Sequence, residues 1–202
     1  MKNLLISLIV GAVAGAVTAT VILYYQAPEV TEDTVKTQEE LIAEFYEVEN
    51  AVHVSPHHVR KHIGDGEVTL VDLRSQEEYE TAHIIGAINI PVYATPDKSD
   101  YDSVDRIVNS FKELPQNTDI VVYCYSAPCM TGRKIGLMLA DNGVYVQHLG
   151  IGWSEWKYYW NMWNHDGETA VNPDDYIFSG SEPGIFEGEA TSGCSIGGEL
   201  DC

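Results

Sequence analysis

The sequence of 202 residues predicts an α/β fold in which a mostly parallel sheet is covered by helices on both faces. Short apolar runs of strand length alternate along the chain with segments that have the apolar periodicity of helices. Turn residues, mainly Gly, Pro and Asn, separate these segments. After an apolar N-terminal segment, about 175 residues remain, which is enough for one domain with a full core.

The expected helices start at recognisable capping signals. Thr37 with Glu40, and Ser75 with Glu78, have the spacing of a capping box, and Ser55-Pro56 puts proline in a first turn. We expect helices over residues 37–49, 55–63, 103–111, 131–140 and 153–163, with a short one after Ser75. The expected strands cover residues 51–54, 68–73, 87–90, 119–123 and 144–148.

The N-terminal segment has the composition of a membrane anchor. Residues 4–25 carry no charged side chain, and a run of about 20 apolar residues is what a membrane-spanning helix requires. We expect residues 1–25 to be an uncleaved transmembrane helix and residues 26–36 an acidic linker. A cleaved signal peptide is the alternative, but Tyr24-Tyr25-Gln26 is a poor cleavage site.

Few charges flank this segment, and they favour one orientation. Lys2 precedes it and the first basic residue after it is Lys36, so the N-terminus is expected inside the cell. The chain would then be a single-pass protein of the cell membrane with its domain outside the cytoplasm. Gly11 and Gly15 have the spacing at which two such helices pack closely, which suggests a homodimer.

The formal net charge is −20, and the acidic residues are unevenly placed. They crowd in residues 29–49 and again in residues 166–201, where no Lys or Arg occurs. An acidic surface argues against binding to nucleic acid. We expect residues 37–165 to form the domain and residues 166–202 to be an irregular acidic tail rich in Gly and Ser. Its apolar anchors would be Tyr176-Ile177-Phe178 and Ile185-Phe186.

The main candidate for chemistry is Cys124, which follows the apolar run Ile120-Val121-Val122-Tyr123. A buried strand is expected to end at this cysteine, and a short loop then leads into a helix that begins near Thr131. Backbone N–H groups of the loop and the positive end of the helix dipole would both favour the thiolate, which is the reactive form of cysteine. Ligands of parallel sheets bind at the carboxyl ends of strands, where Cys124 lies.

From about Val54 to Trp163 the chain resembles the rhodanese-like family, in particular its single-domain sulfurtransferases. Three sets of residues carry the resemblance. The first signature is matched by Val71-Asp72-Leu73-Arg74, Glu77-Glu78-Tyr79 and residues 83–91. Val122-Tyr123-Cys124 matches the strand that enters the active-site loop, and residues 143–146, residues 149–153 and Trp156 match the closing signature.

The resemblance implies a rhodanese-like fold and a persulfide mechanism. Cys124 would take the outer sulfur of a small donor such as thiosulfate or a persulfide, and a thiol or another nucleophile would accept that sulfur. The resemblance implies no metal and no other cofactor. The expected active-site loop after Cys124 comprises Tyr125, Ser126, Ala127, Pro128, Cys129, Met130 and Thr131.

The loop departs from the common pattern of the family. From Cys124 to Met130 it has seven residues, a length that resembles the related dual-specificity phosphatases and some arsenate reductases. Those enzymes require an arginine six positions after the cysteine to bind oxyanion oxygens. Met130 occupies that position and Arg133 comes three residues later, which argues against phosphatase activity.

Other polar residues are given supporting or open roles. Asp72 and Arg74, with Glu78, are expected to form a structural ion-pair group, and Arg133 is a further supporting candidate. His83 is expected to pack and hydrogen bond. His58 and His62 share a helix face, but two ligands are too few for a metal site.

The remaining cysteines leave two other classes of function open. Cys129 either resolves a Cys124 persulfide or sulfenate by forming a disulfide, or simply fills space in the loop. Cys194 and Cys202 either form a local disulfide or act as a mobile dithiol that returns to Cys124. The chain is therefore alternatively a thiol-disulfide oxidoreductase, or a binding module whose loop is inert.

Overall fold

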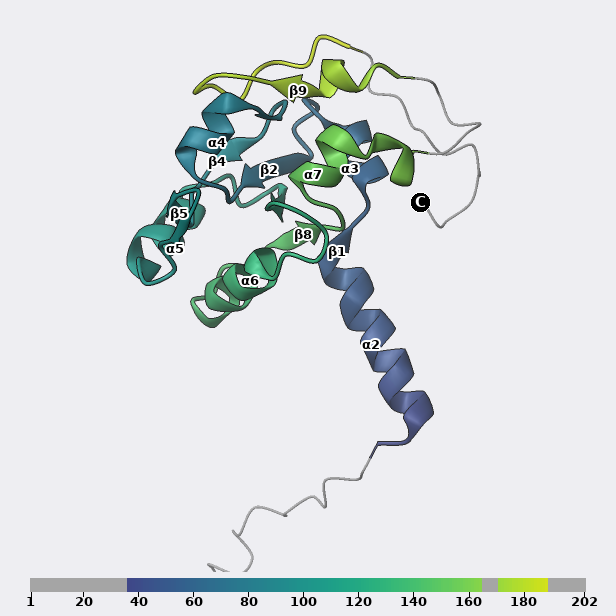
Figure 1. Cartoon of the computed structure of the whole chain (residues 1–202). Coiled ribbons are helices and arrows are strands. Elements are labelled where there is room, and N and C mark those ends of the chain that lie inside the picture. The colour runs from purple at the N-terminus through teal and green to yellow at the C-terminus, as the bar shows by residue number, and fades with distance from the viewer. Residues whose placement is uncertain (1–35, 165–170, 189–202) are drawn as a thin grey trace, which may run out of the picture. The chain divides into compact units, whose positions relative to one another are not determined.

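The computed structural model describes residues 36–164 and 171–188, and a parallel sheet forms its centre (Figure 1). Its five strands run in the order β1-β8-β7-β2-β4, and every neighbouring pair is parallel. These strands are β1 His53–Val54, β2 Val68–Asp72, β4 Ile88–Asn89, β7 Asp119–Tyr123 and β8 Gln147–Leu149. The predicted α/β fold with a parallel sheet is thus confirmed.

Helices cover both faces of the sheet (Figure 1). On one face lie α3 Pro56–His62 and α7 Trp153–Tyr158, and on the other lie α5 Val104–Lys112 and α6 Thr131–Asp141. The described residues also form α4 Gln76–Thr81, α2 Gln38–Val52, which has no buried residue, and 3-10 turns at Trp160–Met162 (η1) and Pro173–Tyr176 (η2). Short strands outside the main sheet are β3 His83–Ile84, β5 Tyr93–Thr95, β6 Lys98–Ser99 and β9 Ile177–Phe178. The chain divides after Ile42 into two compact units, and the sheet belongs to the second.

The alternation of side chains along the strands creates two hydrophobic cores. Leu70 and Val121 face the core that contains α3 and α7, whereas Val71 and Val122 face the core that contains α5 and α6. Burial on both faces explains why these strands read as continuous apolar runs in the sequence.

The capping signals predicted at Thr37, Ser55 and Ser75 are present at helix starts. Ser75 and Glu78 form a complete capping box at α4, and Thr37 and Glu40 exchange the corresponding hydrogen bonds at α2. The helix ends were less predictable: α2 continues to Val52, and the predicted helix over residues 153–163 breaks at Tyr159, beyond which the chain forms η1. The last strand of the sheet starts at Gln147 rather than at residue 144.

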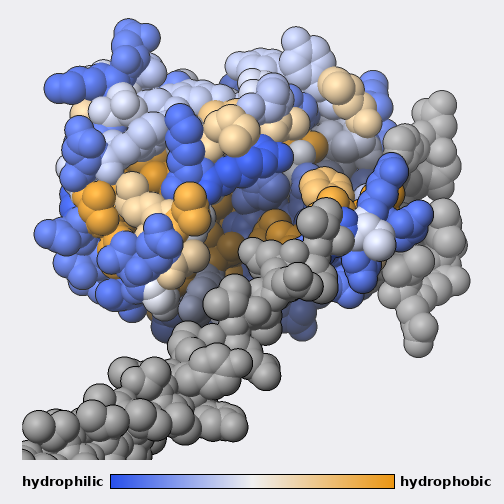
Figure 2. Space-filling model, turned by 90° about the horizontal axis from the view of Figure 1, so that it is seen from below, coloured by the Kyte–Doolittle hydropathy of each residue, from blue (hydrophilic) through white to orange (hydrophobic). Residues whose placement is uncertain are grey.

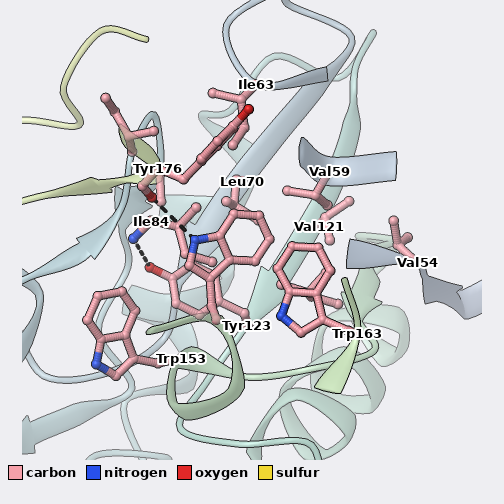
Figure 3. Packing of buried hydrophobic residues seen from close by; sticks show 14 of the residues in the cluster. Val54, Val59, Ile63, Leu70, Ile84, Val121, Tyr123, Trp153, Trp163 and Tyr176 are labelled. Atoms are coloured by element: carbon pink, nitrogen blue, oxygen red, sulfur yellow. Dashed lines mark hydrogen bonds between the residues drawn. The ribbon is translucent and has the colours of Figure 1, made fainter. Parts of the chain in front are cut away.

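Residues 171–188 are more ordered than the irregular tail that the sequence predicts. β9 pairs antiparallel with β3, and Tyr176 is buried in the core, where its carbonyl accepts a hydrogen bond of 3.3 Å from the Trp156 indole (Figure 3). Phe186 stacks on Tyr176, whereas Ile185, an expected anchor, is 85% exposed. The segment is held because two short strands satisfy each other's backbone groups at a site where aromatic rings gather.

The structure does not describe the proposed anchor, the linker up to residue 35, or Cys194 and Cys202. Within residues 36–164 and 171–188, no helix is both long and apolar enough to cross a membrane.

Candidate functional site

The candidate site lies where β7 ends and α6 begins. β7 carries fully buried Val121 and Val122 and delivers Cys124, whose side chain is 5% exposed. A turn closed by the Cys129 N–H donating to the Ser126 carbonyl shapes the loop, and α6 then starts at Thr131, as predicted. Cys124 therefore lies at the carboxyl end of a central strand, where parallel sheets bind ligands.

The start of α7 holds this loop in place. The Trp153 N–H donates to the Cys124 carbonyl, and the Ser154 N–H donates to the Tyr125 carbonyl at 2.8 Å. The two backbones approach so closely at Gly152 that a Cβ atom there would lie 2.2 Å from the Ser126 nitrogen. Glycine is therefore required under the loop, since any side chain would displace it.

Two thiols face each other inside the loop. The Sγ atoms of Cys124 and Cys129 are 3.4 Å apart, and both residues are free thiols. Cys129 is also the more accessible of the two, because Cys124 is buried and Cys129 is half-buried. The sequence left the role of Cys129 open, and the fold brings its sulfur into contact with the candidate nucleophile.

The acidity of the two thiols is the reverse of what the sequence predicts. Burial, together with the neighbouring Cys129, raises the pKa of Cys124 far above its usual range. Burial also opposes ionisation of Cys129, but hydrogen bonds from the side chain and backbone of Thr131 outweigh it and lower the pKa of Cys129. The expectation that the loop favours the Cys124 thiolate is thus wrong for this conformation, in which Cys129 has the lower pKa of the two thiols.

A cluster of hydroxyl groups supports the Cys129 sulfur. The Thr131 Oγ1 lies 3.3 Å from the Cys129 Sγ, 2.7 Å from the Tyr93 hydroxyl and 2.8 Å from the Tyr101 hydroxyl. The thiol of Cys129 donates to the Thr131 hydroxyl, and the two tyrosine hydroxyls are also hydrogen bonded to each other at 3.0 Å. When this network donates to the Thr131 oxygen, the proton of Thr131 is available to a Cys129 sulfur that has lost its own. No sequence pattern indicates that these tyrosines belong to the site, because they come from the β5–β6 hairpin region, which carries no strong strand pattern.

Asp72 and Arg74 form the buried ion pair that the sequence predicts. The Arg74 Nη2 lies 2.6 Å from the Asp72 Oδ2, and the hydroxyl of Tyr123, next to Cys124, donates to the same carboxylate at 2.7 Å. Burial opposes the charge on Arg74, but Asp72 outweighs it and raises the pKa of the guanidinium. The pair fixes the strand residue that precedes Cys124, and Glu78 accepts from the Tyr125 hydroxyl at 2.6 Å.

Comparison with known proteins gives the family. The model of the rhodanese-like domain matches residues 55–158, just over half of the chain. The chain belongs to the rhodanese-like family. It is 40% identical over 92 residues to an HTH-type transcriptional regulator of Mycobacterium tuberculosis, a match that covers 46% of this chain and 35% of the regulator. The chain therefore spans about a third of the length of that curated relative.

Solved structures with similar folds include a Bacillus halodurans protein and a Pseudomonas aeruginosa thiosulfate sulfurtransferase. The Bacillus halodurans protein is 23% identical with a TM-score of 0.48, and the match covers 71% of this chain and 88% of that protein's chain. The thiosulfate sulfurtransferase is 21% identical with a TM-score of 0.42, and the match covers 64% of this chain and 20% of that enzyme's chain.

Arg133 is not part of the loop in this rhodanese-like domain. It is exposed on α6 and lines a groove of about 620 Å³ with Leu137, Val146 and His148, while none of the groove residues belongs to the loop 124–130. Figure 2 shows hydrophobic residues gathered among hydrophilic ones on this face of the molecule. Met130, at the position where phosphatases place arginine, is 53% exposed.

The histidines have structural contacts. His83 is buried, stacks on Tyr79 and shares a 2.7 Å hydrogen bond with the Tyr79 carbonyl, which confirms its predicted packing role. The His62 Nδ1 lies 2.7 Å from Asp65 and 3.0 Å from Glu67, so two carboxylates that the sequence analysis did not consider lie beside it.

Proposed function

We propose that this rhodanese-like protein is a sulfurtransferase that carries sulfane sulfur as a persulfide on Cys124. One observation supports the proposal above the others: in a chain of this family, Cys124 ends the central strand β7 and opens the loop that leads into α6. This position presents a thiol at the carboxyl end of the sheet, where a small donor would bind.

The proposed loading step transfers one sulfur atom from the donor. With thiosulfate, the Cys124 sulfur forms a bond to the outer sulfur, and the S–S bond of thiosulfate breaks with its electron pair remaining on sulfite. The thiol and thiosulfate thus give a persulfide and sulfite, and the thiol proton stays with the persulfide. A thiol or another nucleophile would then accept the outer sulfur.

Mass spectrometry of the full chain tests this proposal. Trypsin cleaves after Lys112 and after Arg133, so the single peptide of residues 113–133 contains both loop cysteines. After treatment with thiosulfate or glutathione persulfide, this peptide should gain about 32 Da, the mass of one sulfur. Cys124→Ser should abolish both the gain and the release of sulfite. Equal sulfur transfer by the wild type and Cys124→Ser would refute the proposal, and a wild type that gains no sulfur would favour a binding module.

The N-terminal segment supports a further part of the proposal. Residues 1–25 would anchor the chain in the cell membrane, with the domain outside the cytoplasm and with Gly11 and Gly15 between two copies. Protease added to intact cells should therefore digest the domain. Digestion only after lysis would contradict this orientation.

A further inference from the structure

The second thiol of the loop has no role in a simple sulfur transfer, yet its position is specific. The Sγ of Cys129 lies 3.4 Å from the Sγ of Cys124 and 3.3 Å from the Thr131 hydroxyl. In a persulfide on Cys124, the Cys124 Sγ becomes the inner sulfur of the S–S bond. Cys129 is therefore already adjacent to the atom at which an attack would release the outer sulfur.

We propose that Cys129 is the resolving thiol of this domain, which expels the bound sulfur as hydrosulfide and leaves a Cys124–Cys129 disulfide. The inference rests on the proposed function, because it requires a persulfide on Cys124. It adds an activity to simple transfer, since the sulfur would leave as hydrosulfide and not on an acceptor thiol.

The step balances as an internal thiol–disulfide exchange. The Cys129 thiolate forms a bond to the Cys124 Sγ, the bond between that sulfur and the outer sulfur breaks, and the electron pair leaves with hydrosulfide. The two cysteine sulfurs are oxidised to the disulfide as the sulfane sulfur is reduced. An external dithiol reductant then returns both cysteines to thiols and is itself oxidised to a disulfide.

The geometry favours this attack over attack by an outside thiol. Reacting atoms that are held at about 3–3.5 Å in a folded site have effective concentrations far above those of free thiols. Closing the present separation to a disulfide bond length of about 2.05 Å requires a movement of only about 1.4 Å. The loop begins at Cys124 and is turned back by the hydrogen bond between Cys129 and Ser126, so the movement lies within a single turn.

The polar surroundings prepare Cys129 to be the attacking group. The pKa of Cys129 is lowered and that of Cys124 is raised, so ionisation favours the sulfur that must attack. Thr131 can donate one proton, and the hydrogen-bonded hydroxyls of Tyr93 and Tyr101 can donate to its oxygen. That proton is then available to stabilise the Cys129 sulfur when it ionises.

A single-turnover experiment on the reduced full chain tests the inference. One equivalent of thiosulfate is added without free thiols, and sulfite, hydrosulfide and the peptide of residues 113–133 are measured under non-reducing conditions. We expect about one hydrosulfide per sulfite and a peptide that is about 2 Da lighter than the dithiol, as a disulfide requires. Cys129→Ser and Cys129→Ala should lower the ratio of hydrosulfide to sulfite at least about tenfold and retain the peptide that carries the extra sulfur.

The outcomes separate this inference from the proposed function. If no sulfite forms and Cys124 gains no sulfur, the proposed function fails. If sulfite forms but the wild type keeps its persulfide and releases no hydrosulfide, only the resolving role of Cys129 is refuted. The double variant Cys194→Ser/Cys202→Ser serves as the control for the tail: loss of hydrosulfide release in this variant would assign the resolving role to the tail thiols and overturn the inference.

Discussion

At the scale of single residues, burial decides which of two neighbouring thiols is the more acidic. Cys124 follows a buried strand and is itself buried, whereas Cys129 is half-buried and lies beside Thr131. Desolvation penalises the charged form of a group, and hydrogen bonds to the charged form oppose that penalty. The position of Cys124 at the end of β7 alone would have assigned the lower pKa to the wrong cysteine.

The ion pair of Asp72 and Arg74, which Tyr123 connects to the strand before Cys124, gives a prediction for stability. Asp72→Asn should lower the free energy of unfolding by about 3 kcal/mol, because Arg74 would keep a buried charge without its partner. Tyr123→Phe removes the hydroxyl that donates to Asp72 and accepts from the Ile84 N–H, and it should cost about 1–3 kcal/mol. Urea unfolding measures both values. Equal stability of Asp72→Asn and the wild type would mean that the pair does not hold the strand.

His148 gives a prediction for pH dependence. Burial, with the nearby charges of His53 and Arg133, lowers the pKa of His148 from 6.5 to about 4. Between these values the unfolded chain binds a proton at this histidine that the folded chain does not. The contribution of His148 to the free energy of unfolding is therefore fully present above pH 6.5 and is lost as the pH falls toward 4. The free energy of unfolding should therefore decrease over this range, and His148→Asn should decrease less steeply. A variant with the same slope as the wild type would exclude His148 as the cause.

At the scale of elements, the loop depends on a neighbouring helix start as much as on its own residues. The N-terminus of α7 donates backbone hydrogen bonds to the carbonyls of Cys124 and Tyr125, and Glu155 accepts from the N–H groups of Ala127 and Gly152. The loop conformation thus depends on where α7 begins.

Gly152→Ala tests this dependence. Its Cβ would overlap the backbone of Ser126, so the loop would shift and persulfide formation on Cys124 should fall by more than about tenfold. Gly136→Ala is the matched control: its Cβ would meet only Val146, at 3.8 Å, and alanine favours the interior of α6 by about 0.5–1 kcal/mol. Sulfite release measures the effect. Unchanged release from Gly152→Ala would show that the loop tolerates displacement.

At the scale of the whole molecule, the chain joins distant segments into two cores. The core on the side of α3 and α7 receives Tyr176 from beyond residue 170, and Figure 3 shows this ring among side chains that come from β2, β7 and α7. The segment 171–188 therefore contributes to the stability of the domain in addition to extending its surface.

Tyr176→Ala should lower the free energy of unfolding by about 3 kcal/mol, because it removes a buried aromatic ring from this core. Ile185→Ala in the same segment is the control and should change stability by less than about 0.5 kcal/mol, since Ile185 is 85% exposed. Thermal and urea unfolding of both variants measure the difference. Equal effects of the two substitutions would show that the segment is not anchored by Tyr176.

Local rules predicted most of the fold correctly. The capping boxes at Thr37 and Ser75 and the apolar run of β7 depend on interactions within a few residues, so the sequence contains the whole signal. The strand pair β3–β9 has no such signal, because His83 and Phe178 are far apart in the chain and each strand has two residues. Such short strands form only where tertiary packing brings them together.

Local patterns in the sequence were enough to predict the α/β class, the strand that ends at Cys124, the start of α6 and the ion pair of Asp72 and Arg74. Tertiary structure alone decided that Cys129 faces Cys124, that Tyr93 and Tyr101 support Thr131, and that Cys129 is the more acidic thiol. The physical reason is that strand and helix starts follow from local periodicity and capping, whereas acidity depends on burial and on hydrogen bonds from distant segments.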